Sequence, residues 1–107
     1  MTGISAFEII LDDAVYGHFR TLDRKDHRLI LGVIEQQLTY EPVTQTQNRK
    51  PLRIPNTLNA TWELRCGAHN RYRVFYDVDV ESHVVIVLAV GRKVRNGLWI
   101  GNEEIRL

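Results

Sequence analysis

The sequence has a single cysteine, Cys66, and no long run of apolar residues. One thiol cannot form an internal disulfide, and without a second thiol a cysteine-based metal site is not expected. No segment approaches the roughly 18 consecutive apolar residues that a transmembrane helix needs. The opening stretch MTGISAFEII also lacks the basic-then-apolar pattern of a secretion signal. These absences predict a soluble, cytoplasmic chain without a membrane partner.

The charge is nearly balanced overall but unevenly distributed. The formal net charge is +1 over 107 residues, of which 44% are hydrophobic, and this length suits one domain over residues 1–107. Residues 1–43 carry a net −3, residues 44–76 carry +5 and residues 77–107 carry −1. A basic island of this kind attracts phosphate. A solvated basic face would give the same count, so both interpretations stay open.

The N-terminal part predicts one strand followed by two helices. Residues 6–11, AFEIIL, form a short apolar run typical of a strand. Residues 12–22 then place apolar side chains at helical spacing, with Asp12 or Asp13 as the N-cap. Residues 24–40 repeat this pattern behind Asp23. The short connection between the two segments predicts an αα-hairpin.

Two glycines interrupt these helical segments. Gly17 and Gly32 each cost a helix roughly 1 kcal/mol relative to alanine. We therefore expect them to serve packing, by letting the two helices approach closely. After Pro42, the polar, proline-containing stretch 43–57 predicts a loop.

The rest of the chain predicts an antiparallel meander. Residues 59–66 and 71–78 and the run 84–90 are rich in β-branched and aromatic residues, and turn residues separate them. Period-two alternation places the larger apolar side chains of the first two strands on one face, which the helices can cover. That face holds Trp62, Leu64, Cys66, Tyr72, Val74, Tyr76 and Val78. The predicted fold class is α+β, a small antiparallel sheet with a mixed edge and two N-terminal helices on one face.

Arg73 stands in the middle of the strand 71–78, on the opposite face from these apolar residues. Glu63 and Arg65 share that uncovered face, again by alternation. The arginine is then available to a ligand. A surface ion pair with Glu63 across the strands would explain the same position.

The order of strand, two helices, basic loop and meander resembles the RelE/ParE family of toxins from bacterial type II toxin-antitoxin pairs, in its RelE-type branch. The match covers nearly the whole chain. The stretches that carry it are RKPLR (49–53), WELR (62–65), YRVFYDVD (72–79), VVIVLAVGRK (84–93) and NGLWIGNEEIRL (96–107).

The resemblance implies a ribosome-dependent endoribonuclease that cuts messenger RNA and inhibits translation. In such enzymes the 2′-hydroxyl attacks the adjacent phosphate, without a metal or another cofactor, and basic side chains stabilise the phosphorane. The resemblance also implies a cognate antitoxin as partner, and a toxin-antitoxin hetero-oligomer that binds operator DNA through the antitoxin.

The same resemblance assigns roles to individual residues. Arg73 falls where the family holds the scissile phosphate, and Arg92 and Lys93 fall on its second basic catalytic site. Glu63 stands in place of a lysine base and is a candidate base itself. Trp99 replaces a stacking tyrosine and cannot transfer a proton. RNA contacts are expected from Lys50, Arg53, Arg65, Arg95 and Trp99.

These departures leave alternatives open. A ParE-like toxin would use the same scaffold to bind gyrase without cutting RNA. A degraded toxin would keep only its antitoxin-binding role. All of the nuclease assignments require that the cationic groups converge on one uncovered face of the sheet.

Overall fold

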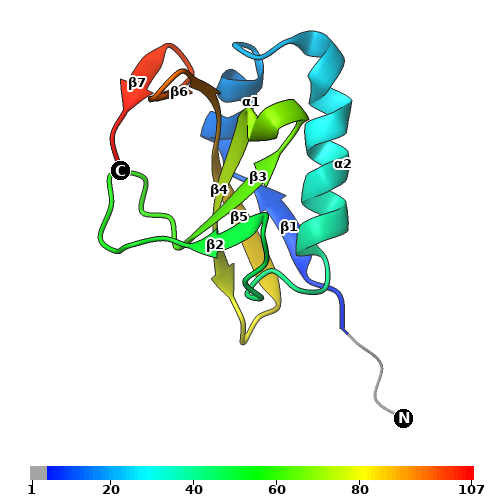
Figure 1. Ribbon diagram of the computed structural model, residues 1–107. Helices are drawn as coiled ribbons and strands as arrows, with labels where there is room; N and C mark the ends of the chain where they lie inside the picture. The colour runs from blue at the N-terminus through cyan, green and yellow to red at the C-terminus, as the bar shows by residue number, and fades with distance from the viewer. Residues whose placement is uncertain (1–4) are drawn as a thin grey trace.

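The computed structural model describes residues 5–107, which fold into a twisted sheet with two helices against one face (Figure 1). The class is α+β, as the sequence predicts. In chain order the elements are β1 (Glu8–Leu11), α1 (Asp13–Phe19), the 3-10 turn η1 (Arg24–Asp26), α2 (His27–Leu38), β2 (Arg49–Pro51), β3 (Trp62–Cys66), the 3-10 turn η2 (Ala68–Asn70), β4 (Tyr72–Asp79), β5 (Val84–Val94), β6 (Gly97–Ile100) and β7 (Glu103–Ile105).

Both predicted helices are present, joined by a short connection, with one correction at the second cap. The Asp12 side chain accepts a hydrogen bond from the Ala14 amide at 3.0 Å and so caps α1. Asp23 makes no such bond, and a 3-10 turn precedes α2 instead. Neither helix is long and apolar enough to cross a membrane within residues 5–107.

The two helix glycines do not serve close packing. A Cβ atom built on Gly17 or Gly32 would meet nothing within 4 Å, because both positions face open space. The expectation that they let the helices approach is therefore wrong.

The sheet is mixed, with one parallel pair at its side. Its strand order is β2-β3-β4-β5-β6-β7, all antiparallel neighbours, and β1 pairs in parallel with β5. The predicted alternation on β3 and β4 is confirmed, since their larger apolar side chains pack under the helices. That main core consists of Val15, Leu22, Ile30, Ile34, Leu38, Leu64, Cys66, Tyr72, Val74, Tyr76, Val85, Val87 and Val90.

An irregularity in β5 changes which way its side chains point. Phe75 pairs with Ala89 but the next residue, Tyr76, pairs with Val87, so Leu88 is an extra residue in the ladder. Such a bulge shifts the alternation of the strand by one residue. Beyond it, Val90 lies in the main core, and Arg92 pairs with Tyr72 on that same helix-facing side.

The face away from the helices is only partly open. A second, smaller core forms there around Phe75, with Ala60, Ala89, Leu98 and Ile100. Leu52 and Leu58 from the loop after β2, and Ile105 from β7, pack against it. The expectation of a wholly uncovered face is therefore wrong, because two chain segments that the sequence pattern predicted as a loop and a tail fold over part of it.

The segment predicted as a loop contains strand β2. Its Arg49 is buried, and its guanidinium donates to the carbonyl oxygens of Gln37 and Glu41 at 2.6 and 2.7 Å. The Tyr76 hydroxyl donates to the Pro42 carbonyl at 2.7 Å. These bonds anchor the segment after α2 to the sheet and fix β2 beside β3.

Candidate functional site

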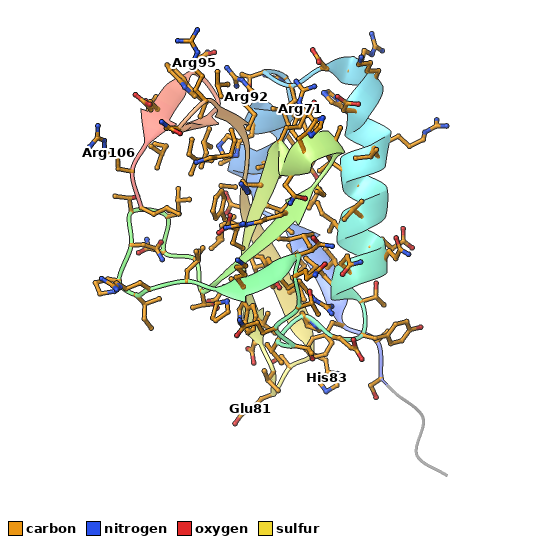
Figure 2. All side chains as sticks on the ribbon, in the orientation of Figure 1. Arg71, Glu81, His83, Arg92, Arg95 and Arg106 are labelled. Atoms are coloured by element: carbon orange, nitrogen blue, oxygen red, sulfur yellow. The ribbon has the colours of Figure 1, made fainter. Side chains whose placement is uncertain are left out.

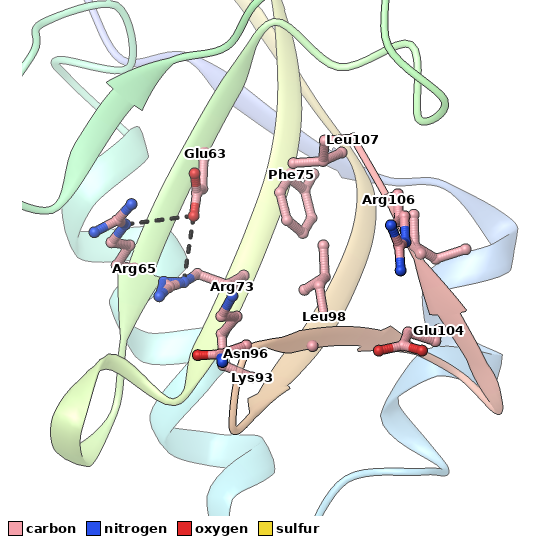
Figure 3. Close-up of a pocket in the computed structure, with 12 residues that line it drawn as sticks. Glu63, Arg65, Arg73, Phe75, Lys93, Asn96, Leu98, Glu104, Arg106 and Leu107 are labelled. Atoms are coloured by element: carbon pink, nitrogen blue, oxygen red, sulfur yellow. Dashed lines mark hydrogen bonds and ion pairs between the residues drawn. The ribbon is translucent and has the colours of Figure 1, made fainter.

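A cavity of about 520 Å³ occupies the remaining part of the face away from the helices. One wall comes from β3, β4 and β5, and the other from the β6–β7 hairpin and the C-terminal residues (Figure 3). Four cationic and two anionic side chains line it, a net charge of +2: Arg65, Arg73, Lys93 and Arg106 with Glu63 and Glu104.

Glu63 lies between two arginines on the strand wall. Its Oε1 is 3.2 Å from Arg73 Nε and 3.4 Å from Arg65 Nε. Arg65 and Arg73 are direct cross-strand partners, a placement that like charges make unfavourable. The shared carboxylate offsets that repulsion, so the ion pair foreseen between Glu63 and Arg73 exists, and it lies inside the cavity.

Arg73 is less solvated than its neighbour Arg65. Its side chain is 11% exposed, against 31% for Arg65. Burial lowers the pKa of Arg73, and the Glu63 carboxylate partly opposes that effect. Within residues 5–107, its Nη1 atom is buried and has no hydrogen-bond partner. Because an unsatisfied buried donor is costly, Arg73 is prepared to bind an anion that enters the cavity.

The cross-strand neighbour of Arg73 on β5 is Gly91. A Cβ atom at Gly91 would lie 2.5 Å from the Trp99 carbonyl oxygen and 2.8 Å from Ile100 Cγ1. Glycine is therefore required for β6 to approach β5 this closely. The close approach brings the hairpin wall over the sheet.

The second wall supplies residues that sequence reasoning missed. Arg106 and Glu104 line the cavity from the C-terminal end, opposite Arg73 (Figure 3). The Thr57 hydroxyl donates to the Arg106 carbonyl at 2.8 Å and so ties this end to the loop after β2. No periodic pattern marks residues 103–107 in the sequence. Only the folding-over of the β6–β7 hairpin brings them to the site.

Two predicted site residues lie on the other side of the sheet. Arg92 Nη1 donates to the Gly101 carbonyl at 3.3 Å, and its guanidinium carbon is 5.9 Å from the centre of the Trp99 ring. Arg92 and Trp99 are cross-strand partners and share the face of Tyr72. The predicted convergence is wrong for these two residues, because the bulge at Leu88 reverses the alternation before position 92.

The remaining predicted contacts do not line the cavity. Lys50 is paired with Glu63 in the β2–β3 ladder and is half-buried beside the arginines. Arg53 is exposed in the loop after β2. Arg95 is exposed in the β5–β6 turn, where its φ of 56° marks a left-handed residue, and it lies at the end of the molecule near Arg92 (Figure 2).

The cavity contains few groups that can move a proton. Its lining has no histidine, and Glu63, Glu104 and Lys93 are its titratable residues besides the arginines. Cys66 lies on the helix side of β3, where burial raises the pKa of its thiol to about 11 and makes it a poor nucleophile. Within residues 5–107, no group of three or more histidine, cysteine or acidic residues is placed to hold a metal ion.

No protein-family model and no curated protein matches this sequence. Among solved structures, a chain of the toxin-antitoxin complex RelBE2 from Mycobacterium tuberculosis is similar. The alignment covers 87% of this chain and 98% of that one, with a TM-score of 0.68 and 22% sequence identity. The fold is therefore the one that the resemblance to RelE/ParE toxins implies. At this identity the likeness establishes the fold alone.

Proposed function

We propose that this chain is the toxin of a toxin-antitoxin pair and that it cleaves messenger RNA on the ribosome. The observation that carries the proposal is Arg73, a nearly buried cation with an unsatisfied donor, in a cavity whose side chains carry a net charge of +2. Such a site favours a phosphodiester, because the fixed positive groups replace the water that the anion loses. The fold shared with a chain of a toxin-antitoxin complex supports the biological setting.

In this proposal Arg73 binds the scissile phosphate, and Arg65, Lys93 and Arg106 surround it. The 2′-oxygen forms a bond to phosphorus while the bond from phosphorus to the 5′-oxygen breaks, and a 2′,3′-cyclic phosphate remains. The cations stabilise the extra negative charge of the phosphorane. Each preorganised contact lowers the activation barrier by about 2–4 kcal/mol.

The proton steps need a base and an acid. Glu63 is the carboxylate adjacent to Arg73, and a phosphate that draws the guanidinium away from it would free an oxygen to accept the 2′-hydroxyl proton. Lys93, on the same face as Arg73, is the cation that can donate a proton to the leaving 5′-oxygen. No metal takes part in this scheme.

A cognate antitoxin is the proposed protein partner, supported by the complex from which the similar structure comes. The ribosome and messenger RNA are the proposed targets. A hetero-oligomer with the antitoxin would bind operator DNA through the antitoxin.

Cleavage is tested in a translation extract by mapping the 5′ ends of ribosome-bound message. The wild-type protein should produce codon-biased cuts, and Arg73→Ala should abolish them while circular dichroism shows an intact fold. Arg28→Ala is the matched control, since it removes an exposed arginine of α2 that lies outside the cavity. Intact message together with gyrase-dependent DNA breaks would replace this proposal by the ParE-like alternative.

A further inference from the structure

The outer face of α2, which points away from the sheet, is exposed (Figure 1). A groove of about 450 Å³ lies on this face. Its lining residues are Gly32, Glu35, Gln36, Thr39 and Tyr40. Gly32 faces outward, since a Cβ atom built on it would meet nothing within 4 Å among residues 5–107.

This outer face has the residue types of a packing surface. Leu29 is 45% exposed and Tyr40 is 55% exposed, although the solvent-facing side of a surface helix is normally polar. Gly32 costs the helix about 1 kcal/mol relative to alanine and packs against nothing within residues 5–107. An outward-facing glycine lets another backbone approach closely. A second helix that docks here would therefore explain both the glycine and the exposed apolar side chains.

The charges on the outer face are complementary to one another across Gly32. Arg28 lies four residues before the glycine and Glu35 lies three residues after it, so at about 3.6 residues per turn both fall on the same flank. If two copies of α2 cross antiparallel at Gly32, a two-fold axis places Arg28 of each copy opposite Glu35 of the other, within about 1.5 Å along the helix axis. Within residues 5–107, neither side chain is used in an ion pair.

The opposite flank of Gly32 is complementary in shape. Leu29 and Gln36 both fall on that flank, three residues before the glycine and four after it. In the same antiparallel arrangement, Leu29 of each copy lies over the groove of the other, between Gly32 and Gln36. Each copy therefore supplies both a projecting side chain and the groove that receives it.

We propose that this chain forms a symmetric homodimer through α2, with Gly32 at the two-fold axis. A helix of a different protein would also fit the groove, but only a second copy explains why Arg28 and Glu35 are placed evenly about Gly32. A contact between single helices is smaller than the roughly 1,200–2,000 Å² of a stable interface, so the dimer should be weak and depend on protein concentration.

The homodimer does not rest on the proposed function. Helix α2 packs on one face of the sheet and the Arg73 cavity lies on the other, so both copies keep the cavity free. Loss of the dimer should therefore leave RNA cleavage unchanged.

Analytical ultracentrifugation of the full chain tests the homodimer in a concentration series up to about 1 mM. The wild type should change from monomer to dimer within the series. Gly32→Gln should weaken the dimer at least about ten-fold, because the larger side chain separates the two helices while the monomer has room for it. Gly17→Gln is the matched control, since a Cβ there also meets open space but lies on α1, and it should associate like the wild type.

An exchange of charges tests the register of the two helices. Arg28→Glu and Glu35→Arg each place like charges opposite one another twice in the dimer, so each should weaken it about ten-fold. The combined variant Arg28→Glu/Glu35→Arg should restore the affinity of the wild type.

Three results would overturn the inference. A wild-type chain that stays monomeric throughout the series would leave the outer face of α2 to a different protein. A dimer that Gly32→Gln does not weaken would place the contact on another surface. A combined charge variant as weak as the single variants would show that Arg28 and Glu35 do not face each other.

Discussion

Replacement of Glu63 by glutamine isolates the electrostatics of the cavity. The substitution keeps the shape of the side chain and removes the charge that Arg73 and Arg65 share. The net charge of the cavity side chains then rises from +2 to +3. We expect a less stable protein that binds single-stranded RNA more tightly.

The size of the stability loss follows from burial. The Arg73 and Glu63 side chains are 11% and 13% exposed, so the pair is nearly shielded from water. Removal of one partner of a buried pair costs about 3–5 kcal/mol, and the remaining exposure reduces this. The free energy of unfolding should fall by about 2–4 kcal/mol.

Urea unfolding measures this loss, with two further variants for comparison. Glu104→Gln removes the exposed carboxylate of the same cavity and should change the free energy of unfolding by less than about 0.5 kcal/mol. Glu63→Gln/Arg73→Met replaces the pair by a neutral and an apolar side chain, and should recover most of the lost stability.

Either of two results would refute this reasoning. One is a Glu63→Gln protein as stable as the wild type, which would mean that water already solvates the charge of Arg73. The other is a double variant no more stable than Glu63→Gln, which would mean that the cost does not come from an unpaired guanidinium.

Four further variants or conditions test other parts of the structure. Gly32→Ala should raise the free energy of unfolding by about 1 kcal/mol in urea, because the helix gains propensity and the Cβ meets open space. Gly91→Ala should lower the free energy of unfolding and reduce RNA binding, because a Cβ would collide with the Trp99 carbonyl. RNA binding as tight as that of the wild type would contradict the close approach of β6 to β5. Arg106→Ala should reduce the slope of log affinity for single-stranded RNA against log salt by about 0.7, and an unchanged slope would place Arg106 outside the RNA site. His18 accepts a hydrogen bond from the Val90 amide, and burial lowers its pKa from 6.5 despite the charge of Asp12. Its contribution to stability should therefore be complete above pH 6.5 and be lost as the pH falls below it, a dependence that His18→Gln should flatten.

The periodic spacing of apolar residues predicted the helices and the faces of two strands. The helices at α1 and α2 and the alternation on β3 and β4 follow from residue spacing alone. The placement of Arg73, Glu63 and Arg65 on one face followed from the same rule and is confirmed by their shared cavity.

Other features depend on pairing between segments that are distant in the sequence, which residue spacing does not reveal. Strand β2 is three residues long and includes Pro51, so nothing local distinguishes it from a loop. The bulge at Leu88 depends on the pairing of β4 with β5, and it moved Arg92 away from the site. Arg106 reaches the cavity only because the β6–β7 hairpin folds over the sheet.

The central claim is that the Arg73 cavity binds an RNA phosphate. The most direct measurement is an NMR titration of the Nε–Hε signals of the arginines with a short RNA that carries 2′-deoxy linkages and cannot be cut. We predict that the signals of Arg73 and Arg65 shift most and that the signal of Arg92, on the other face, stays in place. Shifts confined to Arg92 and Arg95, with Arg73 unchanged, would contradict it.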